Sequence, residues 1–110
     1  SRTYNDVQSK RIEYLKSKLN LENSIDDEKT FFKTKLEKIS MLDERLQITR
    51  EDLEVYDSIL KIINEEKQAQ IKTQSDLDTL QNSQKIKSLD LKIYEIDRQI
   101  ELLELYAKLH

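Results

Sequence analysis

Residues 86–107, IKSLDLKIYEIDRQIELLELYA, repeat isoleucine or leucine at alternating intervals of three and four residues. In heptad notation, positions a and d of a coiled coil face a partner helix. The a and d positions of this stretch are Ile86, Leu89, Ile93, Ile96, Ile100, Leu103 and Ala107. The pattern predicts an amphipathic helix that packs one apolar face against another helix.

An earlier part of the chain carries a second heptad pattern in a different register. With Tyr4 at position a, this register continues without a slip to Ile63. Its most apolar part comprises Ile39, Leu42, Leu46, Leu53, Tyr56, Leu60 and Ile63. The two registers differ by two residues, or roughly 200° around an ideal helix. A break between them is therefore expected, and both sets of residues are predicted to form an oligomer interface.

The break has three candidate positions. Residues 81–85, QNSQK, are the preferred one, because Asn82 can take the left-handed conformation that ends a helix and Ser83 can cap the next helix. A break at 72–76, at the end of the polar stretch 64–76, is the second candidate, because Ser75 with Asp78 three residues later resembles a capping box, and Asn23 to Ser24 is the third. The expected organisation is one long helix over 1–80, a turn at 81–85 and a C-terminal helix over 86–110.

The composition restricts the fold to helices. The chain of 110 residues has no glycine, proline or cysteine, and 37% of its residues are charged. Sandwiches, barrels and doubly wound sheets need many turns, which glycine and proline supply. The expected fold is all-α, with long helices in a coiled coil that forms either an extended parallel oligomer or a folded-back hairpin or bundle. Folding back at Asn82 would bring Ile93 near Ile71 and Leu103 near Leu60.

Charges beside the two patterns indicate different partners, because residues at g and e set helix orientation. In a parallel pair of C-terminal helices, Lys85 and Lys92 meet Asp90 and Asp97 of a second copy, so opposite charges attract each other. The earlier pattern instead favours an antiparallel or heteromeric partner. In a parallel pair its Arg45 would meet Arg50, and its Asp52 would meet Asp57, so like charges would repel.

Four further apolar residues lie near the C-terminus beside the heptad positions. They are Leu102, Leu105, Tyr106 and Leu109. A helix that is apolar on more than one side needs more than one neighbour. We interpret these four residues as a possible surface for a protein partner.

The missing residue types argue against catalysis. Without glycine no phosphate-binding loop can form, and the only histidine is His110. Without cysteine a structural zinc site is not expected. We therefore expect no enzyme activity, no cofactor and no metal. The net charge of −3, with both signs interspersed, gives no reason to expect nucleic-acid binding.

The predicted function is a coiled-coil oligomerisation and protein-scaffolding segment of a larger intracellular protein, cytoplasmic or nuclear. It is expected to form a homo-oligomer, most simply a dimer, and to bind further proteins. The alternative is a membrane-associated helical bundle that tethers or shapes membranes, with Lys29 to Lys38 against anionic lipid. Contact with a membrane is the less favoured of the two, because acidic residues dilute this basic segment.

Overall fold

The computed structural model describes residues 1–110 and contains two helices and no strand. Helix α1 spans Arg2–Gln68 and helix α2 spans Gln74–Leu109. Residues 1–36 form one unit, a single helix, and residues 37–110 form a second unit. The predicted all-α class is confirmed.

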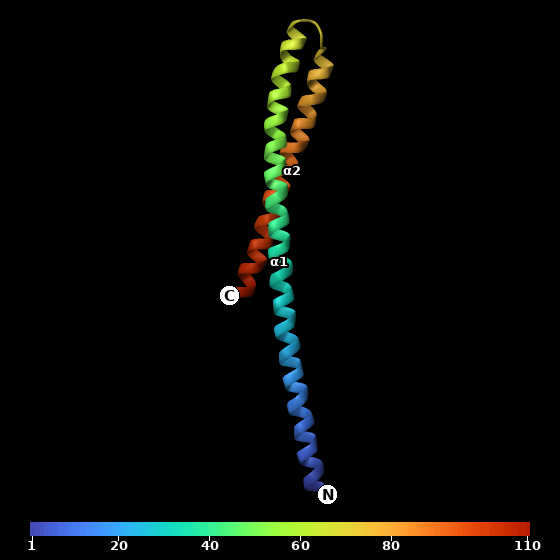
Figure 1. The fold of residues 1–110 in the computed structure, drawn as a ribbon, viewed down its shortest axis with the longest axis vertical. Helices are drawn as coiled ribbons and strands as arrows, with labels where there is room; N and C mark the ends of the chain where they lie inside the picture. The colour runs from blue at the N-terminus through green and yellow to red at the C-terminus, as the bar shows by residue number, and fades with distance from the viewer. The chain divides into compact units, whose positions relative to one another are not determined.

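The second unit is a helical hairpin. From the turn, α2 runs back along the C-terminal half of α1 (Figure 1). The polar contacts fix the antiparallel direction. Near the turn, Gln84 Nε2 donates to Asp57 Oδ1 at 2.6 Å, and farther away Lys38 Nζ lies 2.7 Å from Glu101 Oε1. Of the two architectures left open by the sequence, the chain adopts the folded-back one.

The turn ends α1 with a Schellman motif, although no glycine is present. The Ile71 N–H donates to the Glu66 carbonyl at 2.8 Å, and the Gln70 N–H donates to the Lys67 carbonyl at 2.9 Å. This pair of hydrogen bonds needs a left-handed residue, usually glycine, just after the helix. Gln70 takes that place with φ of 63°. A residue with a Cβ costs roughly 1–2 kcal/mol in this conformation.

Helix α2 begins with a capping box. Thr73 is the N-cap residue, and its hydroxyl accepts a hydrogen bond from the Asp76 N–H. In return, the Asp76 carboxylate accepts from the Thr73 N–H and hydroxyl, each at 2.9 Å. These hydrogen bonds, the backbone one first, lower the pKa of Asp76 because they stabilise its charged form. The capping box thus fixes where the chain re-enters a helix.

The turn predicted at 81–85 is wrong, since these residues lie inside α2. The Ser83 hydroxyl donates back to the Thr79 carbonyl at 3.1 Å, as in a helix interior. The turn lies earlier, in the polar stretch 64–76, and its capping box starts at Thr73 rather than Ser75. The predicted proximities of Ile93 to Ile71 and Leu103 to Leu60 are wrong for the same reason. Tyr94, next to Ile93, instead lies beside Arg45.

The apolar interior of the hairpin is thin. Its buried residues are Ile39, Leu42, Leu46, Thr49, Leu77 and Glu101, and no large side chain is completely buried. A single layer of side chains between two helices therefore holds the hairpin together. Most of the other large apolar side chains remain exposed.

Candidate protein-interaction surface

The apolar row predicted on α1 lies inside the hairpin. Ile39, Leu42 and Leu46 are buried, and the rest of the row is half-buried, namely Leu53, Tyr56, Leu60 and Ile63. The sequence assigned these residues to contacts between copies. In the structure they face α2 of the same chain, because the turn brings that helix alongside them.

The face of α2 that meets this row was not identified from the sequence. We call it the inner face: Leu77, Leu80, Gln84, Lys87, Leu91, Tyr94, Arg98, Glu101 and Leu105, all buried or half-buried. Its residues are spaced alternately by three and four, so they form a heptad pattern of their own. Four polar or charged residues among them hid this pattern. The sequence does contain one indication of this face. Its charged residues have the opposite sign to the residues of α1 that an antiparallel arrangement places beside them.

Pairs of opposite charge line the two helices. Lys87 Nζ lies 3.1 Å from Asp52 Oδ2, Arg98 Nε donates to Asp43 Oδ1 at 2.5 Å, and Arg50 Nη2 lies 3.7 Å from Glu95 Oε1. The hydrogen bond and charge of Asp52 raise the pKa of Lys87. The guanidinium of Arg45 lies over the ring of Tyr94, 5.7 Å from its centroid. The antiparallel partner that the charges of α1 indicated is therefore α2.

The most buried of these pairs is Glu101 with Lys38. The Glu101 side chain is 6% exposed, whereas that of Lys38 is 51% exposed. A buried carboxylate needs a cation or hydrogen-bond donors, since burial alone disfavours its charge. No buried side-chain nitrogen or oxygen of the chain lacks a hydrogen-bond partner. The polar groups inside the hairpin are thus satisfied within one chain.

The opposite side of α2 presents the C-terminal heptad row to solvent. We call it the outer face: Ile86, Leu89, Ile93, Ile96, Ile100 and Leu103. These six side chains are between 45% and 65% exposed. The helical repeat of about 100° per residue places them roughly opposite the inner face. A partner can therefore reach the outer face while α1 stays in place.

The charges beside the outer face are unpaired within the chain. Lys85, Lys92, Asp90 and Asp97 form no hydrogen bond or ion pair in the structure, although the charge of Asp90 contributes to raising the pKa of Lys87. By contrast, Lys87 and Arg98 on the inner face each meet a carboxylate of α1. These four charges have the arrangement that attracts the same residues of a parallel second copy.

The four residues suggested as a partner surface are divided by the structure. Tyr106 and Leu109 are 62% and 65% exposed, whereas Leu102 and Leu105 are half-buried. The Tyr106 ring contacts the His110 ring, with 4.2 Å between centroids. Only Tyr106 and Leu109 are well exposed to a partner.

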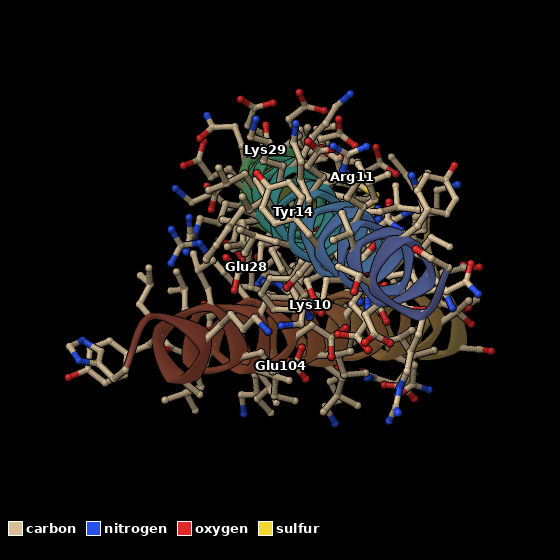
Figure 2. The ribbon with its side chains drawn as sticks, turned by 90° about the horizontal axis from the view of Figure 1, so that it is seen from below. Lys10, Arg11, Tyr14, Glu28, Lys29 and Glu104 are labelled. Carbon is tan, nitrogen blue, oxygen red and sulfur yellow. The ribbon has the colours of Figure 1, made fainter.

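The first unit carries exposed apolar and charged side chains along one helix. Lys10, Arg11 and Tyr14 project from it (Figure 2). In the basic segment proposed for lipid contact, Lys35 lies 5.6 Å from the centroid of the Phe31 ring. Lys38, just beyond this unit, is the residue paired with Glu101. Lys35 and Lys38 therefore both contact other residues of the same chain.

The structure contains no group of three or more histidine, cysteine or acidic side chains placed to hold a metal ion. Neither helix has a stretch apolar and long enough to span a membrane. Comparison with known proteins gives no match to any family model, curated protein or solved structure.

Proposed function

We propose that this chain is a non-catalytic coiled-coil oligomerisation and scaffolding module whose hairpin associates with a second copy through the outer face of α2. The observation that supports the proposal is the row of six exposed isoleucine and leucine side chains from Ile86 to Leu103. Heptad rows of this composition are typical of helix–helix interfaces, with Ile at a and Leu at d favouring parallel dimers.

Apolar burial supplies the driving force. Full burial of one leucine or isoleucine side chain stabilises by roughly 1.5–3 kcal/mol, and the outer face offers six of them in each copy. Loss of motional freedom and partial rather than full burial reduce this gain considerably. The row nevertheless supports association, because each turn of the helix adds about one apolar layer.

The unpaired charges support a parallel arrangement. Lys85 and Lys92 of one copy meet Asp90 and Asp97 of the other, and twofold symmetry repeats each contact. In such a dimer the two α1 helices lie on opposite outer sides, since each packs against its own α2 on the inner face. Tyr106, Leu109 and the exposed residues of α1 remain available to further protein partners.

The test is the solution mass of the double variant Ile93→Asp/Ile100→Asp, measured by light scattering in line with gel filtration. Four buried carboxylates in a dimer interface would be strongly unfavourable. We expect the mass of the assembly to fall by about half. A variant that keeps the native mass contradicts the proposal.

A matched control is Ile48→Asp/Val55→Asp on the outer side of α1. Both native side chains are 56% exposed, so they are at least as accessible as Ile93 and Ile100. The control introduces the same number of charges without touching the outer face. It should retain the native mass, and circular dichroism should show that both variants stay helical.

A further inference from the structure

The first unit also exposes a row of apolar side chains. Its helix exposes Val7, Tyr14, Leu21 and Ile25 by 45%, 67%, 62% and 45%. Helical stability in proteins comes mostly from packing an apolar face against a neighbour rather than from helix propensity. We infer that residues 4–35 pair antiparallel with the same residues of a second copy, forming a self-association site separate from the outer face of α2.

The heptad positions of this unit argue against a parallel pair. Its a positions are Tyr4, Arg11, Lys18, Ile25 and Phe32, and its d positions are Val7, Tyr14, Leu21, Glu28 and Lys35. In a parallel in-register dimer each residue faces its own copy. Four of the ten layers would then bring together two like charges, which is strongly unfavourable at a seam position.

An antiparallel pair replaces these repulsions with complementary layers, because a positions then face d positions. In one register Val7 faces Phe32 of the second copy, and Tyr14 faces Ile25 of the second copy. Arg11 faces Glu28 of the second copy, which matches a cation with a carboxylate. Twofold symmetry repeats each of these three layers.

The central layers of this register are also compatible. Lys18 faces Leu21 of the second copy, with Glu22 of that copy adjacent in sequence. The long lysine side chain can lie along the leucine while its ammonium group reaches the carboxylate or water. The register therefore contains no layer in which like charges meet.

Neighbouring antiparallel registers are less favourable. A shift of one heptad in one direction places Arg11 opposite Lys35 of the second copy, so two cations meet. A shift in the other direction places Arg11 opposite Leu21 and leaves Phe32 beyond the end of the second helix. Only the register that joins Arg11 to Glu28 satisfies both charges and covers the aromatic residue.

Arg11 and Glu28 are free to make this contact. Neither takes part in a hydrogen bond or ion pair of the structure. Arg11 projects from the helix surface near Tyr14 (Figure 2). Two unpaired opposite charges at matching seam positions are what a charge-selective self-interface requires.

The site adds to the proposed α2 interface and does not depend on it. A chain with two different twofold interfaces assembles into closed tetramers or into open chains of copies. The first test therefore uses the full chain carrying Ile93→Asp/Ile100→Asp, which removes association through the outer face. In this background we expect a dimer held by the first unit.

Charge exchange then tests the register. Arg11→Glu in this background places Glu opposite Glu28 of the second copy, and we expect dimerisation at least about tenfold weaker by analytical ultracentrifugation. Adding Glu28→Arg restores opposite charges and should bring the dissociation constant back to within about threefold of the background. Arginine and glutamate are similar helix formers, so neither change removes the helix. A monomeric background, or a double variant as weak as Arg11→Glu, overturns the inference.

Disulfide trapping tests the direction, since the native chain contains no cysteine. Chains carrying Tyr14→Cys and chains carrying Ile25→Cys are mixed and equilibrated in a glutathione buffer. The antiparallel pair predicts that mixed disulfides between the two variants predominate. Predominance of Tyr14→Cys chains linked to each other, or a purely statistical distribution, overturns the inference. If Ile93→Asp/Ile100→Asp leaves the native mass unchanged while this trapping succeeds, only the α2 interface fails.

Discussion

The two faces of α2 differ in composition and in use. The inner face contains Gln84, Lys87, Arg98 and Glu101 among its apolar residues, and it is covered by α1. The outer face has only isoleucine and leucine at its heptad positions, and it is exposed. The less apolar face thus forms the intramolecular contact, whereas the more apolar one is left for another molecule.

The apolar character of a heptad row therefore does not identify the partner that covers it. Hydrophobic periodicity measures how much apolar surface a helix can bury, but not whether the covering helix belongs to the same chain. The charge pairs of the inner face fix which residues of α1 and α2 lie side by side. Apolar rows alone tolerate a shift of one heptad, so the polar contacts supply the register.

The largest contrasting effects are expected from truncating one leucine of α1 that packs inside the hairpin and one leucine of the outer face of α2. Leu42 is 2% exposed in the hairpin, so Leu42→Ala should lower the free energy of unfolding by about 2–4 kcal/mol at every protein concentration. Leu89 is 57% exposed, so Leu89→Ala should change the unfolding of the separate hairpin by less than about 0.5 kcal/mol. Urea unfolding over a range of concentrations measures both.

The same pair of variants can contradict the comparison. Leu89→Ala should weaken self-association about tenfold or more, so its stability loss should grow as concentration rises. An equal, concentration-independent loss in both variants would mean that the outer face is already packed within one chain.

Removing the cation beside the most buried carboxylate is expected to have a smaller effect. Lys38→Met removes the cation 2.7 Å from the buried Glu101 carboxylate and should lower the free energy of unfolding by about 2 kcal/mol. The cost is below that of a fully buried pair because Lys38 is half exposed. In the double variant Lys38→Met/Glu101→Met an apolar contact replaces the pair, and urea unfolding should show most of the stability restored. A double variant with a lower free energy of unfolding than Lys38→Met would show that the ion pair itself stabilises the hairpin.

Reversing the charges beside the outer face is expected to have the smallest effect on free energy. Lys85→Glu/Lys92→Glu makes the contacts with Asp90 and Asp97 of a parallel second copy repulsive. Each exposed contact contributes only a few tenths of a kcal/mol, so self-association should weaken about tenfold at low salt and less at high salt. Sedimentation measures this change, and adding Asp90→Lys/Asp97→Lys should reverse it. Unchanged association at low salt would argue against the parallel arrangement.

Much of the fold could be predicted from the sequence. The absence of glycine and proline indicates long helices, and the row from Ile39 to Ile63 was recognised as a helix-packing row. The preference of this row for an antiparallel partner was visible in Arg45, Arg50 and Asp52, each of which meets a residue of α2. These features depend on spacing and charge, which are properties of the local sequence.

The turn could not be placed correctly by the same reasoning. The sequence favours a turn at residues 81–85 because asparagine commonly adopts the left-handed conformation and the heptad register changes there. The change of register instead separates the two faces of one continuous helix. The actual turn uses Gln70, whose left-handed conformation is imposed by the surrounding hydrogen bonds and not by its own preference. Thr73 with Asp76 and Ser75 with Asp78 fit the capping pattern equally well, so sequence alone did not separate them.

The hairpin contacts also define an order in which the chain can close. Lys67 and Gln74 beside the turn are seven residues apart, Asp57 and Gln84 are 27 apart, and Asp43 and Arg98 are 55 apart. The entropic cost of closing a loop rises with the number of residues in the loop. Each contact already made shortens the loop that the next contact has to close. Contacts between the two helices can therefore form in order from Gln70 toward Glu101, because each new contact closes only a short additional loop. The end where Glu101 meets Lys38 closes last and opens first.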